Sequence, residues 1–244
     1  MGIAKDFNKL VHDQIRVHAA WLPVTNTFQV GDFGVISEGV FVRMGNIRSD
    51  FGVDFQTQPG AQSDLDFKSE RVRVFRLTAG AEVNVFPDEP LAAKLRIEFE
   101  RANSFMLKAS VTVQEMSSVF DAARRLATQQ AWDEGKFKCV AATFTGENAI
   151  VLSSRSNNTV FEIGGKADAL KKLELGNAEA ELTFSGNSSL GLEVIGRTGV
   201  VGLRLFQVKK KSGQAEVLRG APLGPDAVDV VQSEQMQADL PDDL

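Results

Sequence analysis

Apolar residues recur at helical spacing near the start of the chain. This spacing predicts an amphipathic helix that ends before Pro23, with its apolar face built from five residues: Phe7, Leu10, Val11, Ile15 and His18. On such a helix His12 and His18 would lie about 240° apart, so the two imidazoles could not bind one metal ion.

A second helical pattern covers residues 117–133. Ser117 or Ser118 would cap its first turn, and Gly135 would end its last one. A shorter pattern predicts a third helix over residues 166–175. We expect these helices to pack on a sheet.

Between residues 25 and 113 the apolar positions change to a period of two. Leu95, Ile97 and Phe99 alternate with charged residues, so the strand would have one dry and one wet face. Turn signals divide the region into hairpin-sized pieces: Gly31-Asp32, Gly45-Asn46, Pro59-Gly60 and Pro87-Asp88-Glu89-Pro90. This spacing predicts an antiparallel sheet.

Six short apolar stretches follow and also predict strands, over residues 137–144, 149–155, 160–163, 178–184, 190–195 and 200–208. Asn157-Asn158-Thr159 and the glycine-flanked residues 196–199 read as turns between them. The expected fold class is α+β. It would be a mainly antiparallel twisted sheet with an N-terminal amphipathic helix and one or two further helices packed on it.

Acidic residues are concentrated at the C-terminus. The chain carries 27 Lys and Arg against 32 Asp and Glu, a formal net charge of -5. Residues 221–244 carry -6 and no basic residue, which leaves +1 for residues 1–220. We expect one α+β domain over 1–220 and an acidic, proline-containing tail over 221–244, either extended or docked on the domain through its valines.

The residue types that most enzymes need are scarce. Two histidines and one cysteine make a metal centre improbable, and Cys139 reads as a small buried side chain in a strand. Asp32-Phe33-Gly34 and Asp50-Phe51-Gly52 match the metal-binding tripeptide of protein kinases without its companion motifs, so both read as turns. We expect no enzyme, no cofactor and no metal, and the acidic net charge argues against nucleic acid as a partner.

Basic residues form clusters that could meet the phosphates of anionic lipid: Arg71, Arg73, Arg76, Arg124 and Arg125. If these side chains share one face, a domain of net +1 would present a cationic patch. If they are scattered, they only solvate the surface. The sequence leaves both interpretations open.

Taken in order, these elements are similar to the N-terminal pore-forming domain of gasdermins. The resemblance covers about residues 1–210 and is carried by four segments: Leu22-Pro23-Val24-Thr25 after the first helix, Val111-Thr112-Val113 before the second, Gly135–Val140 leading into long strands, and Leu190–Val208 as the last strand pair. The chain departs from the family in two ways. Its length leaves no room for the large helical inhibitory domain of animal gasdermins, and the N-terminal cysteine of bacterial relatives is missing.

The resemblance implies a non-enzymatic protein that converts from a soluble monomer to a membrane oligomer and extends strands into the bilayer. A membrane-crossing strand needs about 9 to 11 alternating residues. Residues 91–113 and 137–163 would supply two hairpins, with Leu95, Ile97 and Phe99 toward lipid. The arginine clusters would then meet acidic lipid.

A soluble β-rich binding or assembly module, forming homo- or hetero-oligomers through its sheet edges, is the alternative. The sequence has no run of about 18 apolar residues and no apolar signal core at its start, so we expect a cytoplasmic protein that associates with membranes on activation. The expected partners are anionic membrane lipid and further copies of the chain.

Overall fold

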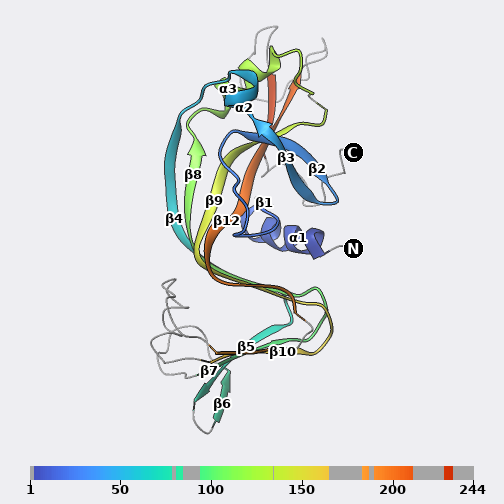
Figure 1. Cartoon of the computed structure of the whole chain (residues 1–244), viewed down its shortest axis with the longest axis vertical. Coiled ribbons are helices and arrows are strands. Elements are labelled where there is room, and N and C mark those ends of the chain that lie inside the picture. The colour runs from blue at the N-terminus through green and yellow to red at the C-terminus, as the bar shows by residue number, and fades with distance from the viewer. Residues whose placement is uncertain are drawn as a thin grey trace, which may run out of the picture.

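The computed structural model describes residues 3–78, 81–84, 94–133, 135–164, 183–186, 190–210 and 228–232. Within them the fold is α+β, with mainly antiparallel strands, an N-terminal helix and two shorter helices, which confirms the expected fold class. A large curved sheet, termed sheet A, forms the upper part of Figure 1, and a small sheet, termed sheet B, forms the lower end.

The described helices are α1 (Ile3–Ile15), α2 (Ile47–Phe51) and α3 (Val119–Ala127). Sheet A contains β1 (His18–Ala19), β2 (Asp32–Ser37), β3 (Val40–Asn46), β4 (Thr57–Lys68), β8 (Phe105–Met116), β9 (Lys138–Ser154), β12 (Leu190–Lys210) and β13 (Val228–Gln232). Sheet B contains β5 (Val72–Thr78), β6 (Ala81–Asn84), β7 (Lys94–Phe99), β10 (Thr159–Gly164) and β11 (Thr183–Gly186).

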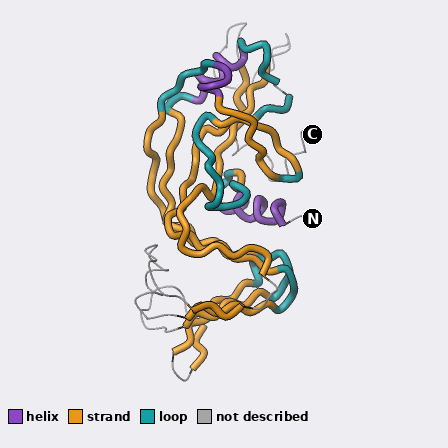
Figure 2. The backbone as a smooth tube through the Cα atoms, in the orientation of Figure 1, coloured by secondary structure: helices purple, strands orange, loops and turns teal. Residues whose placement is uncertain are grey.

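Four stretches of chain, termed the strand arms, pass through both sheets. β4 leads into β5, β7 into β8, β9 into β10, and β11 into β12. The arms keep the same neighbours in each sheet, in the order β4-β8-β9-β12 in sheet A and β5-β7-β10-β11 in sheet B. At the connections the chain reverses, so that sheet B folds back beneath the lower end of sheet A (Figures 1 and 2).

This pairing corrects the two hairpins expected over residues 91–113 and 137–163. β7 pairs with β5 and β10 rather than with β8, and β10 pairs with β7 and β11 rather than with β9. Each predicted hairpin is instead one arm that crosses between the sheets. Alternation locates a strand in the sequence, but it does not identify the strand's partner.

The N-terminal helix is shorter than its apolar pattern predicted. α1 ends at Ile15, Arg16 takes a φ of 57°, and the chain continues into β1. His18 therefore lies on a strand and not on the helix face, so the predicted angular separation from His12 does not apply. The side-chain oxygen of Asn8 accepts a hydrogen bond from the Ala19 amide at 2.8 Å, which ties the helix to β1.

The second predicted helix is confirmed in a shorter form as α3. Ser118 caps it, since its hydroxyl oxygen accepts from the Asp121 amide at 3.3 Å, and the helix ends at Ala127. The short helix α2 was not predicted, because five residues give too little periodicity. Asn46 caps its start, and Gly52, with a φ of 65°, closes its end in the left-handed region.

An apolar layer lies between the two sheets and holds sheet B in place. This interlayer cluster consists of Val72, Ile97, Phe99 and Phe161 from sheet B and Met106, Ile150 and Leu152 from sheet A. All seven side chains are buried. At the opposite end, aromatic rings close the core beside α3, with Trp132 between 5.3 and 5.7 Å from the rings of Phe33, Phe51 and Phe137.

The two central strands are longer than the sequence indicated. Residues 137–144 and 149–155 join into β9, and the turn expected over residues 196–199 lies inside β12, where it forms bulges on either side of Arg197. A Cβ on Gly199 would lie 2.4 Å from the Val24 carbonyl oxygen, so this glycine allows close backbone approach. The turn at Asn157-Asn158 is confirmed.

Part of the predicted acidic tail is described. Val228–Gln232 forms β13 and pairs antiparallel with Phe206–Lys210 of β12, on the same edge that β1 occupies near Leu203. The predicted helix over residues 166–175 and the other residues of the tail lie outside the described part of the chain. Among the described helices, none has both the length and the apolar character to cross a membrane.

Candidate functional site

Sheet B has one dry and one wet face, as the alternation in β7 predicted. Ile97 and Phe99 are buried on the dry face. Ile97 lies opposite Val74 of β5 on one side and Phe161 of β10 on the other. Three neighbouring strands thus turn apolar side chains toward the interlayer cluster.

The wet face carries paired charges. Arg73 forms an ion pair with Glu100 at 2.6 Å, and Arg96 forms one with Glu98 at 2.9 Å. Such half-exposed pairs add little stability, about 0 to 1 kcal/mol each. Their consequence is chemical, because this face carries charged groups of both signs beside the half-buried Phe75, opposite Arg96, and Val160, opposite Glu98.

The candidate membrane-strand residues are only partly described. Ile97 and Phe99 lie on the dry face, while Leu95 is placed by its backbone alone, opposite Arg76 in the ladder of β5 and β7. The side chains of Leu95 and Arg76 lie outside the described part. Of the remaining candidate lipid-binding residues at this end, Arg71 and Arg73 are exposed.

The other two candidate arginines, Arg124 and Arg125, lie on α3, at the end of the molecule opposite sheet B (Figure 1). Arg124 pairs with Asp121 at 3.3 Å and lies over the Phe120 ring at 4.6 Å. Arg125 donates to the carbonyl oxygen of Asp54 at 3.5 Å. The structure therefore does not bring the two clusters of arginines onto one face.

A pocket of about 480 Å³ lies beside α3 and is lined by Asp54, Phe55, Gln56, Ser117, Ser118, Asp121, Ala122 and Arg125. Its serine Ser118 caps the helix and donates to the Asp121 carboxylate at 2.8 Å. A serine nucleophile needs a general base, usually a histidine, within hydrogen-bond reach. The lining of this pocket contains no histidine, so it does not form such a pair.

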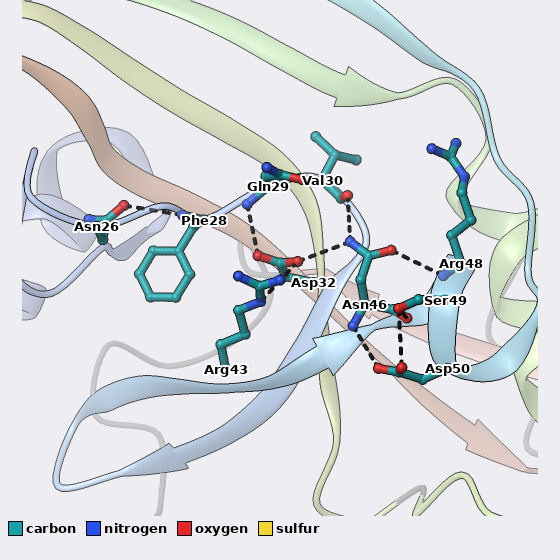
Figure 3. A network of polar contacts seen from close by, with 10 residues as sticks. All are labelled: Asn26, Phe28, Gln29, Val30, Asp32, Arg43, Asn46, Arg48, Ser49 and Asp50. Atoms are coloured by element: carbon teal, nitrogen blue, oxygen red, sulfur yellow. Dashed lines mark hydrogen bonds and ion pairs between the residues drawn. The ribbon is translucent and has the colours of Figure 1, made fainter.

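A buried carboxylate organises the junction between β2, β3 and α2 (Figure 3). Asp32 is 0% exposed. Its oxygens accept from the Gln29 amide at 2.8 Å and the Asn46 side chain at 2.9 Å, and they pair with Arg43 at 3.3 Å. Asn46 also caps α2 by accepting from the Arg48 amide. The carboxylate ties β2 to β3 and to the loop before β2, and Asn46 extends the network to α2.

The first Asp-Phe-Gly tripeptide is therefore not the turn that we expected. Residues 32–34 belong to β2, and a Cβ on Gly34 would collide with the Val42 carbonyl oxygen, so glycine allows the two strands to approach closely at a bulge. The second tripeptide is not a turn either, since Asp50 and Phe51 belong to α2 and only Gly52, with a φ of 65°, has the expected role of relieving backbone strain at the end of the helix. No sequence motif indicated the Asp32 network.

Cys139 lies next to this network and is fully buried. Burial raises the pKa of the Cys139 thiol well above its usual value, and the Asp32 carboxylate raises it further. A thiol in that state is a poor nucleophile. Among the described side chains, no three His, Cys, Asp or Glu residues are grouped as the ligands of a metal ion would be.

His18 lies on β1, the short strand of sheet A that follows α1, and its side chain is buried. The pKa of the His18 imidazole is lowered from 6.5 to about 4, first by burial and then by repulsion from His12 of α1 and Lys138 of β9. The ring is therefore neutral at pH 7. Protonation would place a positive charge beside two basic residues in the interior.

Comparison with known proteins gives one solved structure as a match. It is a bacterial gasdermin from Bradyrhizobium tropiciagri, 12% identical, with a TM-score of 0.38 over 85% of this chain and 88% of that one. No protein-family model matches the chain, and no curated protein matches it either.

We expect Asp32→Ala to lower the free energy of unfolding by about 3 kcal/mol, because it leaves Arg43 and two further donors without their acceptor. Asp54→Ala is the control, since the Asp54 side chain is 85% exposed and pairs, among the described residues, with Arg48 at the surface. Urea denaturation followed by circular dichroism measures both variants. Equal effects would show that the buried carboxylate has no special role.

We expect stability to fall between pH 6.5 and pH 4 because of His18. The unfolded imidazole takes up a proton with a pKa near 6.5 and the folded one only near 4, so the free energy of unfolding decreases as pH falls through this window. The loss from this group is about 3 kcal/mol. Urea denaturation at successive pH values should give a flatter profile for His18→Gln; an unchanged profile would contradict the assignment.

Proposed function

We propose that the chain is a membrane-permeabilising protein that converts from a folded monomer into a membrane-bound oligomer by releasing sheet B from sheet A. The route of the strand arms carries this proposal. Arms β4-β5 and β7-β8 pair with each other in both sheets, and so do arms β9-β10 and β11-β12. Each pair is one long hairpin that is folded back at its connections. Straightening it would preserve its own ladder.

The arms are long enough for this role. In sheet A, β4 and β8 have 12 residues each, β9 has 17 and β12 has 21. The strands of sheet B continue the same arms. A strand crosses the hydrocarbon core with about 9 to 11 residues. A straightened arm could therefore span a bilayer with its sheet B part and lower sheet A part while its upper part stays in sheet A.

The two faces of sheet B suit lipid and water. Release would free the interlayer cluster, including Ile97, Phe99 and Phe161, and lipid tails would replace the apolar neighbours that these side chains lose. Lipid tails are about as apolar as leucine, so this exchange costs little. The ion pairs Arg73–Glu100 and Arg96–Glu98 would remain on the aqueous side. The layout of the sequence, which is similar to that of gasdermin N-terminal domains, supports the same proposal.

A sheet-edge assembly module is the second candidate, and β4 favours it. The strand pairs with β8 on one side only in the described structure, and most of its side chains are exposed. Pro59 and a bulge before Gln62 partly protect this edge against pairing. Assembly through β4 would give oligomers in solution.

Release of a dye from vesicles that contain phosphatidylserine tests the two candidates together. Membrane permeabilisation requires leakage accompanied by oligomers that float with the vesicles. Oligomers in solution with intact vesicles would favour the assembly module instead. A monomer that neither binds lipid nor causes leakage would contradict both.

We expect labels on the two faces of sheet B to report different environments on phosphatidylserine vesicles. Val74 lies opposite Ile97 on the dry face, and Glu98 lies opposite Arg73 on the wet face. Val74→Cys and Glu98→Cys, each in a Cys139→Ser background, would carry an environment-sensitive dye. A quencher attached to the lipid tails should quench the Val74 label only. Equal quenching of both labels would contradict the proposed orientation.

We expect charge reversal at Arg71 and Arg73 to weaken vesicle binding by at least about tenfold, because each arginine near an anionic surface contributes about 1 kcal/mol. These residues lie at the end where the arms would enter the bilayer. Reversal of Arg124 and Arg125 changes the same charge at the opposite end and should have a much smaller effect. Flotation at several salt concentrations measures vesicle binding by both variants. Equal losses of binding would contradict the proposed orientation on the membrane.

A further inference from the structure

Three described connections carry the strand arms between sheets A and B, and together they form the bend: residues 69–71, 100–104 and 155–158. Half of its residues are serine or asparagine, and most of the others are charged. Asn103 and Asn158 have φ values of 57° and 54°, in the left-handed region that asparagine tolerates better than most residues. Two neighbouring arms, β7-β8 and β9-β10, therefore each reverse with an asparagine in the left-handed region.

Ser154, the last residue of β9, is the centre of the hydrogen bonding in the bend. Its amide donates to the Ser104 carbonyl oxygen at 3.0 Å, and its carbonyl oxygen accepts from the Asn103 amide at 2.9 Å. Its hydroxyl donates to the Arg101 carbonyl oxygen at 2.7 Å and accepts from the Ser104 amide at 3.4 Å. Ser154 is 0% exposed, and its polar groups are all hydrogen-bonded to residues 101–104 of the neighbouring β7-β8 arm.

Weaker ties hold the other parts of the bend. The Ser69 hydroxyl accepts from the Phe105 amide at 2.9 Å, which connects the β4-β5 arm to the start of β8. The Asn157 side chain accepts from the Ala102 amide at 2.9 Å, at an exposed position. Each of these two side chains makes one contact, whereas the fully buried Ser154 hydroxyl makes two, of which the one with the Ser104 amide is buried.

We infer that Ser154 is the latch of the bend: its hydroxyl holds residues 100–104 in the folded-back conformation and thereby limits how often the arms straighten. The hydroxyl bonds to Arg101 and Ser104 exist only while that segment is folded against β9. Because they favour one conformation over the other, they shift the equilibrium toward the closed form. The role of the latch in membrane entry rests on the proposed function; the latch itself does not.

Ser153 supplies a matched control. It precedes Ser154 in the same strand and is also 0% exposed, and its hydroxyl has no hydrogen-bond partner among the described residues. Alanine at either position removes one buried hydroxyl of the same size. Only Ser154→Ala removes hydrogen bonds across the bend.

Amide hydrogen exchange of the full-length protein at neutral pH, without lipid, tests the latch. In Ser154→Ala, peptides covering residues 100–105 and 154–160 should exchange about tenfold faster, the effect expected when bonds of about 1 kcal/mol or more are lost at a buried site. A reference peptide over residues 139–144 should be unchanged, as should all peptides of Ser153→Ala. Equal exchange in the two variants, or faster exchange throughout Ser154→Ala, would overturn the proposal.

Ser69→Ala keeps the test decisive if Ser154→Ala does not fold. It should accelerate exchange at residues 69–72 and 105 and leave residues 154–160 near the unaltered rate, because Ser154 still holds them; acceleration at 154–160 as large as at 105 would overturn the central role of Ser154. In the vesicle assay Ser154→Ala should leak faster than Ser153→Ala. Faster local exchange without leakage by any variant would support the latch and contradict the membrane function.

Discussion

The fold depends on the apolar layer between the two sheets. The strand arms continue beyond the upper core, and the lower ends of β8 and β9 turn Met106, Ile150 and Leu152 outward from sheet A. Those side chains would be wet unless something covered them. The arms reverse direction at the bend, so that sheet B, which is made from the same arms, packs its dry face against these three side chains. Burial at roughly 25 cal/mol per Å² drives this closure, and the polar bend determines its geometry.

Sequence patterns predicted the class of fold and the two-faced character of β7, because alternation and turn residues are local signals. They could not predict that β7 and β8 lie in different sheets, since strand partners depend on contacts far apart in the chain. They also placed His18 on the helix, because a buried strand residue fits a helical apolar face by chance. The Asp32 network was not predicted for a related reason: its donors come from two separate segments, Gln29 in the loop before β2 and Arg43 and Asn46 on β3.

For the charged residues, too, the sequence predicted one part of the arrangement and missed another. Clusters of arginine were evident in the sequence, but the structure separates the pair on α3 from the pair beside β5 and gives Arg73 and Arg124 acidic neighbours. A net charge of +1 for residues 1–220 therefore conceals two distinct ends. Only the end with Arg71 and Arg73 lies beside strands whose dry face could be transferred to lipid, so the two ends of the molecule are not equivalent.

β12 carries strands from both termini on one edge: β1 pairs at Gly202 and Leu203, and β13 at Phe206–Lys210. During synthesis on the ribosome, β1 emerges long before β12 exists, so β1 cannot pair until Gly202 and Leu203 have been made. Contacts between residues so distant in sequence slow folding. α1 can contact β3, β4 and β8 earlier, whereas β1 leaves the ribosome without its pairing partner and stays unpaired until β12 has been made.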